Sequence, residues 1–294
     1  MTSAATNPIG VHALVWVGDT TPESVASAVR NTAQSGFDLL ELSLHDSVHL
    51  DTTAARERLA EAGLGVVCSR GLAFDADVSS AEPDVADRGA RLLADSVRIT
   101  HELGGTLLTG ALYSALGKYG APLSAAGRRN AVSALRAVAA EAAALGVTLG
   151  LEICNRYETN VVNTTADALR LADDIGADNV VIHLDTYHMN IEEKDFATPV
   201  RLAGQRLRYV HIGENHRGYL GSGHLDFDSF FDALAGIGYS GPITFESFSS
   251  AVVSPHLTSD LAIWRNLWTD SMDLATHART YIAGQLSRAV LAGR

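Results

Sequence analysis

The stretch Val180-Val-Ile-His-Leu-Asp-Thr-Tyr-His188 joins an apolar run to two chemically active side chains. The apolar, β-branched residues predict a buried strand over 180–185. Asp185 stands at the end of this strand, and His188 follows three residues later. This stretch decides how the rest of the chain is interpreted, because three further predicted strands also carry a polar side chain at or next to their last residue.

Together these strands offer four candidate metal ligands: Glu152, Asp185, His211 and Glu246. Three oxygen donors and one imidazole suit a divalent ion such as Mg²⁺, Mn²⁺ or Co²⁺, whereas thiolate-rich sites favour softer metals. One acidic residue at a strand end is commonly only a helix cap or an ion-pair partner. Four are harder to explain in that way, because a buried polar group without a partner is costly. The sequence therefore predicts one divalent metal ion.

Apolar runs of strand length alternate with amphipathic helical segments along the whole chain. Eight strands are predicted, at 12–17, 37–44, 64–68, 106–109, 147–152, 180–185, 207–212 and 241–246. Helices are predicted at 20–34, 52–62, 83–103, 124–145, 164–176 and 227–234, with a short one within 196–205 and helical structure from 259 onward. Eight βα units without a linker predict an α/β fold, a (β/α)₈ TIM barrel in which residues 1–294 form a single domain.

A doubly wound open sheet is the alternative fold, because periodicity alone does not show closure. The loop after the first predicted strand contains no Gly-x-Gly-x-x-Gly, so a dinucleotide site is not expected. In a barrel, the active site lies at the carboxyl ends of the strands, where the four candidate ligands stand.

The charge and composition exclude several classes of protein. The 22 Lys and Arg against 34 Asp and Glu give a net charge of −12, which argues against a nucleic-acid partner. No apolar run approaches the length that spans a membrane, and the first ten residues do not resemble a signal peptide. We therefore expect a cytoplasmic protein with no membrane partner. Cys68 and Cys154 are expected to be reduced, partly buried thiols.

Further polar residues follow the same strands. His188 and Arg217 share loops with the candidate ligands, which favours contact with a substrate. His183 lies two residues before Asp185 on the same face of the strand, which favours an interior residue over a ligand. His12 and Trp16 could line a pocket or fill the barrel, and both interpretations stay open. His216 is expected to be a loop residue, and a pairing of Arg156 with Glu158 would have only a structural role.

Several long segments together resemble the ketose 3-epimerases of the xylose isomerase-like TIM barrels, the group that acts on D-tagatose, D-allulose (psicose) and L-ribulose. The segments are Glu152-Ile-Cys-Asn-Arg-Tyr-Glu158, Leu184-Asp-Thr-Tyr-His-Met-Asn-Ile-Glu-Glu193, His211-Ile-Gly-Glu-Asn-His-Arg217 and Phe245-Glu-Ser-Phe248. The resemblance extends to Gly110-Ala-Leu-Tyr-Ser114 and to Trp264-Arg-Asn-Leu-Trp268, and so covers nearly the whole chain.

The resemblance implies one Mn²⁺, Mg²⁺ or Co²⁺ ion per subunit on the four ligands, and Glu158, His188 and Arg217 around the reacting end of the sugar. It implies a distal pocket around Trp16, Cys68, Leu112, Tyr113 and Phe248 that sets preference among ketoses. It also implies association as a homodimer or homotetramer. The apolar residues between 249 and 268 agree with such an association.

The hypothesis for the reaction is inversion of C3 of an unphosphorylated ketose through a cis-enediolate, with Glu152 and Glu246 exchanging the roles of base and acid. Aldose–ketose isomerisation and an inosose dehydratase-like lyase are alternatives on the same scaffold. A DNA-repair nuclease is disfavoured by charge, and a non-catalytic sugar-binding protein has no evident use for an acid–base pair.

Overall fold

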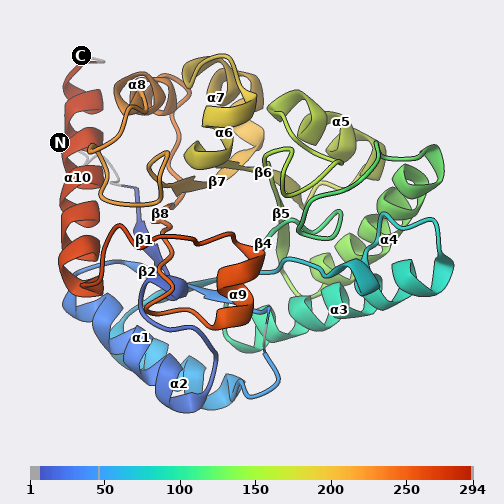
Figure 1. The fold of residues 1–294 in the computed structure, drawn as a ribbon, viewed down its shortest axis with the longest axis horizontal. Coiled ribbons are helices and arrows are strands. Elements are labelled where there is room, and N and C mark those ends of the chain that lie inside the picture. The colour runs from blue at the N-terminus through green and yellow to red at the C-terminus, as the bar shows by residue number, and fades with distance from the viewer. Residues whose placement is uncertain (1–6, 46, 293–294) are drawn as a thin grey trace.

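A computed structural model describes residues 7–45 and 47–292, and within them eight parallel strands form a closed barrel in chain order (Figure 1). The strands are β1 Ile9–His12, β2 Leu39–Ser43, β3 Gly65–Ser69, β4 Leu107–Gly110, β5 Thr148–Glu152, β6 Val180–Asp185, β7 Leu207–Ile212 and β8 Ile243–Phe245. β1 pairs with both β2 and β8, which closes the sheet. The predicted TIM barrel is confirmed, and the open sheet is excluded.

Helices surround the barrel (Figure 1). They are α1 Pro22–Gln34, α2 Thr52–Ala62, α3 Pro83–Glu102, α4 Ala125–Ala144, α5 Thr165–Ile175, α6 Thr186–Glu192, α7 Ala197–Ala203, α8 Phe227–Gly236, α9 Pro255–Asp260 and α10 Ser271–Ala292. Side-chain caps explain several starts: Thr21 accepts a hydrogen bond from the Ser24 amide, and Thr164 and Asp167 form a reciprocal capping box. No helix within the described residues is long and apolar enough to cross a membrane.

The first strand predicted at 12–17 is wrong. The strand ends at His12, and the chain turns into a 3₁₀ helix at Ala13–Val15. The Leu14 amide donates to His12 Nδ1 at 3.1 Å and stabilises this turn. The apolar residues of the turn are buried, so their hydrophobicity alone could not separate turn from strand. As a result, His12 stands at the carboxyl end of β1.

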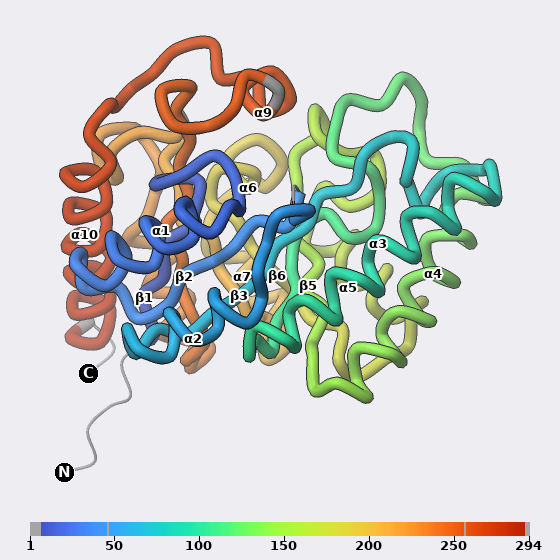
Figure 2. The backbone as a smooth tube through the Cα atoms, turned by 90° about the horizontal axis from the view of Figure 1, so that it is seen from below, coloured from blue at the N-terminus to red at the C-terminus, as the bar shows by residue number. Residues whose placement is uncertain are grey.

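The prediction that helical structure fills the chain from 259 onward is wrong for residues 261–270. α9 ends at Asp260, and α10 begins only at Ser271. Between them, Ala262 adopts a left-handed backbone conformation with φ 52°, which interrupts helical geometry. Figure 2 shows this segment and α9 covering the same end of the barrel at which α6 lies.

Candidate active site

The carboxyl ends of four strands bring the candidate metal ligands together. One ligand atom from each of Glu152, Asp185, His211 and Glu246 lies within 4.8 Å of those of the others. His211 Nδ1 lies 3.3 Å from Glu152 Oε1, 3.5 Å from Glu246 Oε1 and 3.8 Å from Asp185 Oδ2. Asp185 also caps α6, because its Oδ1 accepts the Tyr187 amide while Oδ2 faces the cluster.

The donor set of this cluster fits a divalent cation. His211 Nδ1 is buried and has no hydrogen-bond partner, although three carboxylates surround it. The other ring nitrogen, Nε2, lies 2.6 Å from Glu41 Oε2. Three carboxylate oxygens and one imidazole nitrogen that converge in this way would hold a divalent ion.

Burial and the attraction between opposite charges dominate the electrostatics of the cluster. Burial raises the pKa of Glu246 to about 8, against the opposing effects of Arg217 and His211. Burial would lower the pKa of His211, but Glu41 and Glu246 hold it well above its ordinary value. Burial lowers the pKa of His12 to about 4, which leaves that ring neutral near pH 7. So much negative charge around His211 favours a cation between the carboxylates.

Arg217 bridges two of the carboxylates. Its Nη1 lies 2.6 Å from Glu246 Oε2 and 3.2 Å from Asp185 Oδ2. The guanidinium carbon lies 3.9 Å from the centre of the Tyr187 ring, within cation–π range. Arg217 has a left-handed backbone with φ 59°, and strain of this kind at a non-glycine residue is concentrated at functional sites.

Glu158 and His188 lie together on the other side of the cluster. The side-chain Nδ2 of Asn155 donates to Glu158 Oε1 at 2.8 Å, and the backbone N–H of Asn155 donates to His188 Nδ1 at 3.2 Å. His188 Nε2 is therefore the ring nitrogen that bears the proton in the neutral imidazole, and it lies 3.7 Å from Asp185 Oδ2. Arg156 pairs with Glu192 instead of Glu158.

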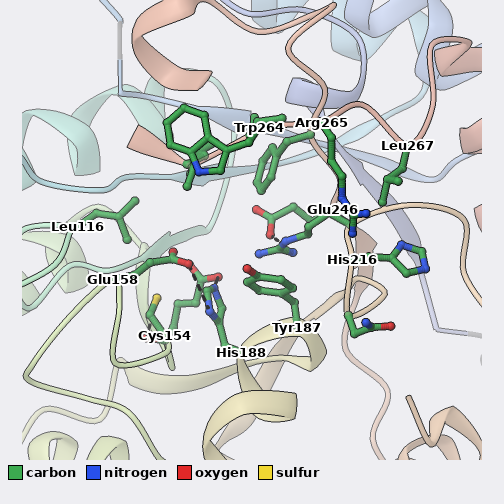
Figure 3. A pocket seen from close by; sticks show the side chains of 17 residues that line it. Leu116, Cys154, Glu158, Tyr187, His188, His216, Glu246, Trp264, Arg265 and Leu267 are labelled. Carbon is green, nitrogen blue, oxygen red and sulfur yellow. Dashed lines mark hydrogen bonds and ion pairs between the residues drawn. The ribbon is translucent and has the colours of Figure 1, made fainter. Parts of the chain in front are cut away.

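Two adjoining cavities meet at the cluster, and Glu152, Glu246 and Phe248 line both. The first, of about 390 Å³, is lined by Glu158, Tyr187, His188, His216, Arg217 and residues 261–265 and 267. Figure 3 shows Trp264 and Arg265 across this cavity from His188 and Tyr187. The second, of about 500 Å³, extends toward His12, Ser43, His45, Ser69, Arg70 and Phe74.

Trp16, Cys68 and Tyr113, predicted to contact the substrate, line neither cavity. Cys68 and Ser69 are neighbours on β3, and neighbouring side chains on a strand face opposite sides. Ser69 therefore faces the second cavity, whereas the Cys68 thiol is buried and its pKa is raised to about 12 by burial. Both Cys68 and Cys154 are free thiols, as predicted.

The other two residues are held elsewhere by hydrogen bonds. Trp16 follows the 3₁₀ turn, and its Nε1 donates to Thr32 Oγ1 on α1 at 3.0 Å. Tyr113 is fully buried, and its hydroxyl donates to the Glu152 carbonyl of β5 at 2.6 Å. Leu112 is fully buried and also lies outside both cavity linings. Phe248 is the member of the predicted distal pocket that lines the cavities.

Sequence reasoning missed Glu41, Tyr187 and the segment around Trp264 as parts of the site. Glu41 had a visible signal, because it is an acidic residue between leucines in the buried strand Leu39-Leu-Glu-Leu42. His12 lines the second cavity, which settles one question that the pattern left open. His183 is an interior residue, with Nδ1 2.8 Å from Thr109 Oγ1.

A closed barrel whose strand ends bring together three carboxylates and one imidazole has the architecture of a TIM-barrel enzyme. The chain belongs to the xylose isomerase-like TIM barrel family, whose model matches residues 29–274, and within it to the ketose 3-epimerases. It is therefore an enzyme of the isomerase class.

Similar proteins support this placement along nearly the full length of the chain. A ketose 3-epimerase from Arthrobacter globiformis is 49% identical over 95% of this chain and 96% of its own length. An L-ribulose 3-epimerase from Methylomonas sp. is 47% identical over 93% of this chain and 96% of its own. A crystal structure of a Methylomonas D-allulose 3-epimerase in complex with D-allulose superposes with a TM-score of 0.93 at 46% identity, covering 96% of this chain and 98% of that one.

Proposed function

We propose that this enzyme inverts C3 of free ketoses, such as L-ribulose and D-allulose, with the help of a divalent metal ion. The names of its relatives supply the substrate class. The observation that carries the proposal is the pair Glu152 and Glu246. Glu152 ends β5, Glu246 directly follows β8, and both line the two cavities as members of the ligand cluster.

The pair suits the chemistry of inversion at C3. That reaction removes the C3 proton from one face and returns a proton to the other, through an enediolate of the substrate. A divalent ion on Glu152, Asp185, His211 and Glu246 would supply polarisation of the neighbouring ketone, which makes the proton acidic. One carboxylate takes the proton as base while the other gives one as acid, and the roles exchange for the reverse reaction.

The remaining polar residues position the reacting end of the sugar. Arg217 adds positive charge next to Glu246, where negative charge develops on the substrate oxygens. His188 offers the Nε2 proton, and Glu158 offers a carboxylate that accepts a hydrogen bond from a sugar hydroxyl. Carboxylates of Glu152, Glu158 and Glu246 line the first cavity, so a sugar phosphate would meet negative charge there. Unphosphorylated ketoses are therefore the proposed substrates.

Deuterium labelling tests this proposal against isomerisation. Turnover of L-ribulose or D-allulose in D₂O should place deuterium at C3 of the product ketose, because C3 loses and regains its proton at the carboxylate pair. An aldose–ketose isomerase would label C1 or C2 and form an aldose. Nuclear magnetic resonance of the isolated product locates the label. Deuterium at C1 without deuterium at C3 would overturn the proposal.

Metal binding should be coupled to proton release. In the absence of the ion, the pKa of Glu246 is raised to about 8 and that of His211 is raised as well, so both groups hold protons at neutral pH. The ion binds only the carboxylate and the deprotonated Nδ1. Its affinity should therefore rise with pH through this region, and binding at neutral pH should release protons. Calorimetry in two buffers of different ionisation enthalpy measures that release, and equal heats in both would contradict it.

We also propose that the protein associates as a homodimer or homotetramer. Part of the apolar stretch at 249–268 is covered within the chain, because Val253 and Leu257 pack against Leu14. Trp264 nevertheless remains 76% exposed and Leu267 39% exposed, and both line the first cavity. Exposed large apolar side chains on one segment favour a protein contact.

A further inference from the structure

Glu41 is a fully buried carboxylate on β2 for which the proposed reaction has no use. It reaches across the barrel interior to β7, where its Oε2 lies 2.6 Å from His211 Nε2 and accepts a hydrogen bond from the Tyr209 hydroxyl at 2.7 Å. A buried charge without a compensating partner is strongly destabilising. We therefore expect the Glu41 carboxylate to have a role toward the residues that it contacts.

The contact determines which nitrogen of His211 carries a proton. A carboxylate accepts hydrogen bonds, so Nε2 is the donor toward Glu41. Nδ1 is then the nitrogen that faces Glu152, Asp185 and Glu246, and it has no hydrogen-bond partner. The alternative tautomer would place a proton on Nδ1, where a metal ion would need a lone pair.

His12 approaches Glu41 from the opposite side. The Leu14 amide donates to His12 Nδ1, so the proton of the neutral ring is on Nε2. That nitrogen lies 3.3 Å from Glu41 Oε1 and 3.9 Å from Glu246 Oε1. Within the described part of the chain, the imidazoles that face the Glu41 carboxylate are the neutral His12 ring, at 3.3 Å, and His211, at 2.6 Å. The negative charge of Glu41 therefore acts mainly on His211, the closer of the two.

We propose that Glu41 is a positioning residue that holds His211 with Nδ1 toward the metal ion and strengthens that nitrogen as a ligand. The inference rests on the metal site of the proposed function. A carboxylate that accepts the second N–H of a ligating histidine orients the ring and raises its basicity, and loss of such a partner typically weakens metal affinity about 10–100-fold.

The test compares two variants that alter the same hydrogen-bond cluster. Glu41→Gln keeps the shape of the side chain but removes its charge. Tyr209→Phe removes the other donor to the same Glu41 oxygen and leaves the His211 contact intact. Binding of Mn²⁺ to chelator-stripped protein is measured by calorimetry, and folding is checked by circular dichroism and Tm. We expect Glu41→Gln to weaken Mn²⁺ binding about 10–100-fold and Tyr209→Phe to change it by less than about threefold.

The possible outcomes separate the role of Glu41 from the existence of the metal site. Wild-type affinity in folded Glu41→Gln, or an equal loss in both variants, would overturn the role of Glu41. A wild-type protein that binds no Mn²⁺ would instead refute the metal site itself.

If Glu41→Gln does not fold, ¹⁵N nuclear magnetic resonance of the wild-type histidines saturated with Mg²⁺ gives a second answer. The signal of His211 is assigned by its absence in His211→Asn. We expect a proton on Nε2 and none on Nδ1, and a proton on Nδ1 in the loaded protein would exclude the proposal.

Discussion

Glu246→Gln and Glu152→Gln should each lower kcat/KM for a ketose by at least about 10²–10⁴-fold, the usual contribution of general acid–base catalysis. The loss should exceed that range where the change also removes a negative ligand from the metal ion. Steady-state kinetics at saturating Mn²⁺ measures it. Glu193→Gln is a matched control, because Glu193 is a carboxylate outside the cluster that accepts the Thr165 amide at 2.7 Å.

The two roles of each glutamate can be separated. A variant whose activity returns with excess metal has lost mainly ligation, whereas a variant that binds metal normally and stays inactive has lost proton transfer. A variant that lacks one carboxylate should still exchange the C3 proton of one epimer with solvent while forming little of the other. Near wild-type turnover in both glutamine variants would remove the carboxylate pair from the mechanism.

Removal of the metal ion should abolish activity and lower thermal stability together. An ion that binds only the folded state at 100 times its Kd stabilises that state by about 2.7 kcal/mol. For a chain of 294 residues such a loss lowers Tm by roughly 4–5 °C. Treatment with a chelator followed by a thermal melt and an activity assay tests this, and Mn²⁺, Co²⁺ or Mg²⁺ should restore both quantities.

Asp185→Asn provides the control for this experiment. With one ligand charge removed, the chelator should produce a much smaller change in Tm, because less metal is bound at the start. Full activity in exhaustively stripped wild-type protein would contradict the role of the four ligands. An equal chelator effect on wild type and Asp185→Asn would place the stabilising ion elsewhere.

The sequence predicted the barrel and the ligand cluster because both depend on local patterns. An apolar run that ends in a carboxylate or an imidazole is visible without tertiary information, and strand ends of a parallel barrel meet at one rim. β6 and β7 were predicted with the bounds that the structure has. These elements fixed the positions of Asp185 and His211.

The lining of the distal pocket could not be predicted. It depends on the exact residue at which each strand ends, which the sequence pattern does not give. A shift of one residue exchanges Cys68 for Ser69 at the cavity, and the 3₁₀ turn after His12 carries Trp16 toward α1. Glu41 was visible as a charge in an apolar strand, but its partner His211 lies 170 residues away in the chain. The interruption of helical structure at Ala262 could not be predicted either, because no glycine or proline stands next to this residue.

The division of the site into two cavities has a consequence for how such an enzyme can be redesigned. The proton-transfer carboxylates lie where the cavities meet, while Ser43, Ser69 and Phe74 belong to the second cavity alone. Libraries of variants at these three positions would reshape the second cavity without touching the carboxylates proposed to handle C3. New sugar preferences should therefore be accessible by mutation without rebuilding the chemistry.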